Sequence, residues 1–251
     1  MTTLSQIGED FRRALATDLH PVGFGFRATR PADAISLKSK GQGCIMPLIF
    51  SAANGKTVAI DINTTGWPCS AYYLGYADWI FPGIERYLSD GLEGRECERF
   101  IASPEQARPY VERMRISPPS TGVAVFQPLA HARDENRPEV VLFFADADRL
   151  SALVFLAHFH DPSIDDRIVA PFASACAAVT TLPLKYARAG QSKAVWGMHD
   201  IAARARLPRD LMSFAVPLAL AERMHADIDK SFLGTSKWEA LKRRFQTSAN
   251  L

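Results

Sequence analysis

The fold is decided by two stretches, GVAVFQPL at residues 122–129 and EVVLFFAD at residues 139–146. Both are rich in β-branched and aromatic residues, so each predicts a β-strand. The polar link HARDENRP at residues 131–138 fits a hairpin loop between them, and a longer connection is also compatible with it.

Further strands and helices are expected on both sides of this pair. No regular strand–helix–strand repeat appears, so the pattern predicts an α+β fold with a mixed or antiparallel sheet assembled from both halves. The additional strands are expected at residues 34–38, 57–62, 193–198 and 211–217. Helices are expected in the first nineteen residues and at residues 70–79, 104–115, 147–160, 165–180, 199–207, 217–229 and 237–246.

The chain is expected to form one domain over residues 1–251, with a weak internal break near residues 117–120. Lys and Arg number 29 and Asp and Glu 27, which gives a formal net charge of +2. This balance creates no global field for nucleic acid or acidic membranes, so we expect neither as a partner. The sequence carries no signature of an oligomeric state, and whether it is an enzyme stays open.

A cytoplasmic location is expected for this chain. No apolar run approaches the roughly 18 residues of a membrane span, and residues 1–19 carry charges where a signal peptide needs an apolar stretch. Leu4, Ile7, Phe11 and Leu15 instead recur on one face of an amphipathic helix. In the cytoplasm, cysteines are free, metal-bound or catalytic more often than disulfide-bonded.

Four cysteines, Cys44, Cys69, Cys97 and Cys176, are the main candidates for a functional site. Four thiolates suit a [4Fe–4S] cluster or a structural zinc ion. No C-x-x-C pair occurs, so the four positions must converge from distant loops. We predict a [4Fe–4S] cluster on these cysteines, with a redox or small-molecule role. The competing interpretations are core packing for Cys176, in an alanine-rich helix, and a surface thiol for Cys97.

A metal-free module that binds a small molecule is the alternative function. Aromatic residues crowd residues 67–79, and a flat ligand could stack there. Asp200 and Arg204 have the spacing of an ion pair on one helix face. The predicted ligand pocket consists of Trp67, Tyr72, Tyr73, His199, Asp200 and Arg204.

Two weaker candidates involve histidines. A thiol enzyme would use Cys44 or Cys69, and it needs a depressed thiol pKa and a histidine or positive partner, for which His199 is the nominee. His158 and His160 with Asp161 could offer metal ligands, although a helix end is the commoner explanation of that pattern.

Three stretches of the chain resemble the family called domain of unknown function 169. They are Gly43-Cys44 before an apolar run, Pro68-Cys69-Ser70-Ala71-Tyr72-Tyr73-Leu74-Gly75, and Ser174-Ala175-Cys176 together with residues 197–204 and SFAVP at 213–217. The resemblance extends from the first helix to about Trp238, and Cys97 fits it least. It implies a shared fold and a similar placement of the cysteines, and it implies no activity.

Overall fold

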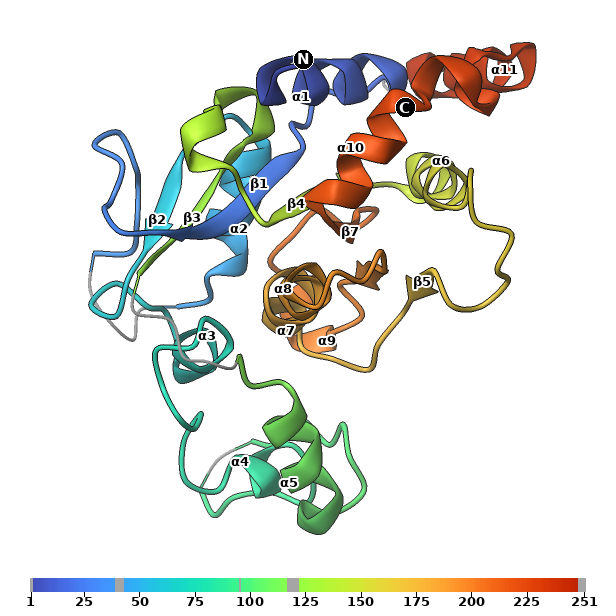
Figure 1. Ribbon diagram of the computed structural model, residues 1–251. Coiled ribbons are helices and arrows are strands. Elements are labelled where there is room, and N and C mark those ends of the chain that lie inside the picture. Colours follow the sequence, from blue (N-terminus) through green and yellow to red (C-terminus); the bar gives the residue numbers. More distant parts are fainter. Residues whose placement is uncertain (1, 39–42, 95, 117–121, 248–251) are drawn as a thin grey trace.

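The structure is a computed structural model that describes residues 2–38, 43–94, 96–116 and 122–247. Its centre is a seven-stranded mixed sheet with the strand order β2-β3-β1-β4-β7-β6-β5 (Figure 1). Neighbouring strands pair antiparallel, except that β5 and β6 are parallel. The α+β class, with one sheet built from both halves, is confirmed. The strands are β1 Val22–Arg27, β2 Val58–Ile60, β3 Val123–Pro128, β4 Val140–Ala145, β5 Ile168–Val169, β6 Ala194–Gly197 and β7 Met212–Pro217.

The strands β3 and β4 form no hairpin, because β1 lies between them. The link between β3 and β4 crosses β1 at close range. A Cβ atom added to Gly23 would lie 3.0 Å from the Pro138 ring, and one added to Gly25 would lie 3.3 Å from the Glu139 nitrogen. The two glycines of β1 therefore make room for the crossing, and the longer connection is the one that forms.

Each face of the sheet carries its own hydrophobic core. Along β4, Val140, Leu142 and Phe144 enter one core, and the alternating side chains at 141, 143 and 145 enter the other, as a pleated strand requires. The first core is covered by α2 Met46–Ala53, α3 Pro68–Tyr73, α7 Ala175–Val179 and α8 Thr181–Arg188. The second is covered by α1 Leu4–Ala14, α6 Ala147–Ala157, α10 Leu218–Ala226 and α11 Ser236–Thr247.

Several expected elements differ from the observed ones. The helix predicted at 165–180 is wrong, because β5 and an irregular segment containing Pro171 occupy its first half and α7 begins only at Ala175. The strand predicted at 34–38 is reduced to a single bridge from Ile35 to β2. The predicted break near 117–120 lies outside the described residues. Within the described ranges, no helix is long and apolar enough to cross a membrane.

The α3–α5 segment (residues 68–113) extends beyond one end of the sheet (Figure 1). It contains α4 Ile84–Tyr87 and α5 Pro104–Arg113. Short elements elsewhere in the chain are α9 Ile201–Arg204 and 3-10 turns at Leu129–His131, Asp134–Asn136, Ile228–Lys230 and Phe232–Gly234. Tyr76 ties the segment to the sheet. Its hydroxyl accepts a hydrogen bond from the Ala124 amide (2.9 Å) and shares its proton between the carbonyls of Ile60 (2.8 Å) and Gly122 (2.7 Å).

We predict that Tyr76→Phe lowers the free energy of unfolding by about 1–3 kcal/mol, because it leaves the partly buried Ala124 amide without this acceptor. Urea denaturation would measure the change. Tyr186→Phe is the matched control, since the Tyr186 hydroxyl forms no hydrogen bond within the described residues. A loss below about 0.5 kcal/mol, typical of a neutral surface change, would contradict this role for Tyr76.

Candidate functional site

A cavity of about 540 Å³ lies where the α3–α5 segment meets α7 and α9. This volume is in the usual range for small-molecule sites. The lining side chains come from residues 44–46, 67–73, 80–88, 174–176 and 200–206, together with Glu98. Segments more than a hundred residues apart in the sequence therefore share one concave surface.

Three of the four cysteines, Cys44, Cys69 and Cys176, line this cavity. The Cys176 thiol forms hydrogen bonds with both of the others, and its own pKa is raised by these contacts and by burial. All four cysteines of the chain are free thiols. Cys69 and Cys176 each occupy the first turn of a helix, α3 and α7, and Cys44 lies two residues before α2.

A contact between two glycines brings the Cys44 and Cys69 loops together. The Trp67 amide donates a hydrogen bond to the Gly43 carbonyl at 2.8 Å. A Cβ atom on Gly66 would lie only 2.3 Å from that same oxygen, so a larger residue could not fit. The glycines that precede the two cysteines in the sequence thus make their convergence possible.

The pKa of the Cys44 thiol is shifted in the direction opposite to that of Cys176. The pKa of Cys44 is lowered to about 7, chiefly by the hydrogen bond from Cys176, and burial only partly opposes this. The Met46 amide also donates to Cys44 Sγ at 3.4 Å, and the positive charge of Arg206 contributes. This thiol therefore has more thiolate character near neutral pH than an ordinary cysteine, and the thiolate is the form that binds metals and attacks electrophiles.

Cys97 lies apart from the other three cysteines. It is half-buried, is not part of the cavity lining, and its Sγ lies 3.5 Å from where a Cβ on Gly91 would stand. In the described part of the chain, no group of three or more His, Cys, Asp or Glu side chains is arranged to hold a single metal ion. As they lie, the side chains of Cys44, Cys69 and Cys176 therefore do not form such a group.

Asp200 joins two of the helices that line the cavity. Its carboxylate accepts hydrogen bonds from the amides of Ala202 (2.9 Å) and Ala203 (3.3 Å) and so caps α9. The other oxygen accepts from the Ala175 amide of α7 at 2.9 Å. Arg204 does not pair with it and donates instead to the carbonyls of Leu211 and Arg209.

The remaining predicted pocket residues divide between the cavity and the rest of the fold. Trp67 and Tyr73 line the cavity along with Asp200. Tyr72 is buried elsewhere and donates to the Val111 carbonyl at 2.7 Å. His199 is exposed and its Nε2 lies 3.2 Å from the Trp196 carbonyl. The residues Tyr72, His199 and Arg204 therefore do not face the cavity.

Two charged residues that line the cavity, Glu98 and Arg206, are not among the pocket residues expected from the sequence. Burial raises the pKa of Glu98 to about 7, helped by the nearby charge of Asp200 and opposed by a hydrogen bond with Tyr87. The Arg206 guanidinium lies over the Trp67 ring, 4.5 Å from its centroid. No local motif marks either residue, and only the folded chain brings them to the cysteines.

The backbone next to each cavity carboxylate is strained. Arg99, which follows Glu98, has φ 51°, and Met198, two residues before Asp200, has φ 71°. Both values fall in the left-handed region that residues with a side chain rarely adopt. Such strain concentrates at functional sites, where surrounding contacts compensate for it.

The histidine pair His158 and His160 forms no common site with Asp161. His158 Nδ1 lies 2.9 Å from the Val154 carbonyl, whereas His160 Nε2 lies 3.0 Å from Asp227. Asp161 pairs with Arg167 instead. The three side chains therefore serve the local structure around the end of α6.

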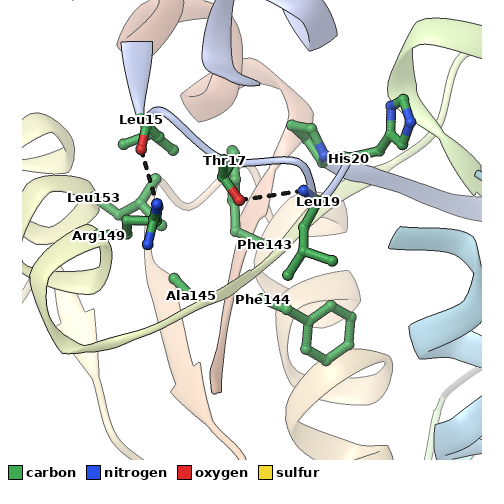
Figure 2. Close-up of a pocket in the computed structure, with 10 residues that line it drawn as sticks. Leu15, Thr17, Leu19, His20, Phe143, Phe144, Ala145, Arg149 and Leu153 are labelled. Carbon is green, nitrogen blue, oxygen red and sulfur yellow. Dashed lines mark hydrogen bonds between the residues drawn. The ribbon is translucent and has the colours of Figure 1, made fainter. Parts of the chain in front are cut away.

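A second, much smaller cavity of about 10 Å³ lies near the end of α1 (Figure 2). Arg149 Nε donates to the Leu15 carbonyl at 3.0 Å across it, and the Leu19 amide donates to Thr17 Oγ1 at 3.2 Å. This space can hold at most about one water molecule. Arg149 thus fastens the loop after α1, and the candidate functional site remains the cavity of the three cysteines.

The comparison with known proteins agrees with the resemblance seen in the sequence. The family model named domain of unknown function 169, described as uncharacterised ArCR, matches residues 10–227, which contain all four cysteines and every residue of the cavity. No curated protein and no solved structure matches the chain. The match covers well over half of the chain, so this protein belongs to the family of domain of unknown function 169.

Proposed function

We propose that Cys44, Cys69 and Cys176 hold a [4Fe–4S] cluster in the wall of the cavity, where it serves a redox or binding role toward a small molecule. The observation that carries the proposal is the convergence of three thiols from three separate segments on one cavity. A cubane cluster has four irons, so three cysteine ligands leave one iron without a protein ligand. Such an open position would allow the group to bind a small molecule in the cavity.

The lowered pKa of the Cys44 thiol favours a role as a metal ligand over a role as an inert core residue. A buried cysteine that only packs keeps its proton and behaves as a small apolar side chain. Cys44 instead receives hydrogen bonds from Cys176 and from the Met46 amide, and the pKa of its thiol is lowered to about 7. Hydrogen bonds from amides to a ligand sulfur are also a way in which proteins tune a cluster.

A metal-free binding module remains the second candidate, and the aromatic lining of the cavity favours it. Tyr73, Phe81 and Tyr87 line the cavity, and so does Trp67, of whose surface 40% is exposed. Aromatic walls of this kind suit a flat or apolar ligand. Under this alternative the thiols would form part of the wall, with Cys44 as a reactive group.

The cluster proposal predicts a different outcome for each cysteine. We expect anaerobically purified or reconstituted protein to contain iron and sulfide in comparable amounts and to absorb broadly in the visible region. Cys44→Ser, Cys69→Ser and Cys176→Ser should each lose most of the iron, because each removes a ligand. Cys97→Ser is the matched control and should keep it, since Cys97 is outside the cavity lining.

Three results would contradict the proposal. These are a colourless protein without iron after reconstitution, zinc alone in stoichiometric amount, or equal iron loss from all four variants. Circular dichroism of each variant separates the loss of a ligand from the loss of the fold.

The metal-free protein allows a separate test of Cys44. We predict that its alkylation by iodoacetamide, followed by mass spectrometry, rises with an apparent pKa of about 7. The thiolate is the reacting form, so the rate should fall as the pH is lowered below that value. Cys176→Ala removes the main stabilising hydrogen bond and should move the pKa upward, toward that of an ordinary thiol. An unchanged profile in this variant would contradict the assigned cause.

A further inference from the structure

The charged side chains around the cavity differ in how many of their hydrogen-bonding positions are already used by protein partners. Asp200 already accepts three backbone hydrogen bonds. Arg206 is exposed and its guanidinium lies over Trp67, which places this pair where the cavity meets solvent. Glu98 is half-buried and lines the cavity itself. It is therefore the carboxylate most available to a bound molecule.

Glu98 is held in position and keeps capacity for a ligand. Its amide donates to the Tyr87 carbonyl at 2.8 Å, which fixes its backbone against α4. Its carboxylate has a hydrogen bond with the Tyr87 side chain. Two carboxylate oxygens can accept about four hydrogen bonds. Among the described residues Tyr87 is the one side chain bonded to this carboxylate, which leaves room for another donor.

The ionised form of Glu98 is destabilised when the cavity contains no cation. Burial and the negative charge of Asp200 raise the pKa of Glu98 to about 7. Within the described residues, the charged or titratable groups that interact with Glu98 or line the same cavity are Asp200, Arg206, Tyr73, Tyr87, Tyr110 and the thiols of Cys44, Cys69 and Cys176. A bound positive charge would relieve this repulsion.

The aromatic lining provides the second half of a site for a cation. Phe81 and Tyr87 pack edge to face with ring centroids 5.7 Å apart, and Tyr73 lines the same cavity. The faces of aromatic rings attract organic cations through their negative π clouds. The Arg206 guanidinium over Trp67 is an example of the same interaction within this chain.

We infer that the cavity binds a small organic ammonium ion, with its charge against Glu98 and its apolar part against Tyr73, Phe81 and Tyr87. The inference rests on the binding of a small molecule in this cavity and does not depend on the cluster. Glu98 lines the same cavity as the aromatic rings and the three cysteines, so its charge would select the ligand.

Isothermal titration calorimetry with benzylamine and its neutral analogue benzyl alcohol tests the inference on the full chain. We expect benzylamine to bind about tenfold more tightly, because only the cation gains the charge-assisted hydrogen bond and the cation–π contact. Glu98→Gln should remove this preference. Glu96→Gln is the matched control, since Glu96 is exposed on the same segment and is not part of the cavity lining, and it should keep the preference.

The pH dependence assigns the effect to Glu98. A group with a pKa near 7 must lose its proton to pair with the amine, so the affinity for benzylamine should fall about tenfold from about pH 8 to about pH 6. Benzylamine stays protonated over this interval. Glu98→Gln should abolish the dependence, and a dependence that persists in that variant would assign the titration to Cys44 and overturn the role of Glu98.

Equal binding of benzylamine and benzyl alcohol by the unaltered protein, or binding of neither, would overturn the inference without any variant. The iron content of the same preparation is read separately. A colourless protein that prefers the amine would refute the cluster and leave this inference standing. A brown, iron-loaded protein with no preference for the amine would support the cluster and overturn this inference.

Discussion

The close approach of two backbone segments, at Gly43 and Gly66, is the constraint on which the candidate site depends. The Gly43 carbonyl accepts the Trp67 amide, and no side chain at position 66 could fit beside that oxygen. This single contact brings Cys44 next to the first turn of α3, where Cys69 lies. Cys176 then joins the pair from α7, a helix whose first amide donates a hydrogen bond to Asp200.

The sequence allowed most strands to be predicted, because runs such as residues 139–146 combine β-branched and aromatic residues with a length typical of strands. It did not reveal which strands are neighbours. Pairing β1 between β3 and β4 depends on a long connection crossing over Gly23 and Gly25, and that is a tertiary contact with no local periodicity. The helix predicted at 165–180 is too long, because Pro171 stands inside the range and α7 begins only at Ala175.

Part of the candidate site could also be predicted from the sequence. The turn contexts of Cys44 and Cys69 carried a physical signal, since glycine permits close backbone contacts. Cys97 lies among charged residues, which favoured a surface thiol, and it is absent from the lining of the cavity. Glu98 and Arg206 lie in segments rich in ordinary surface charges, so their place in the cavity emerges only from the packing of α4, α7 and α9.

The sheet separates two hydrophobic cores, and the cysteines of the cavity belong to one of them. The side chains of α1, α6, α10 and α11 pack on one face, and every cysteine of the cavity packs on the other. Substitutions that repack the side chains of α1, α6, α10 and α11 against the sheet change the thermal stability of the chain. They leave the residues that line the cavity unaltered. The stability of the fold and the chemistry of the cavity can therefore be altered independently, each from its own side of β4 and β7.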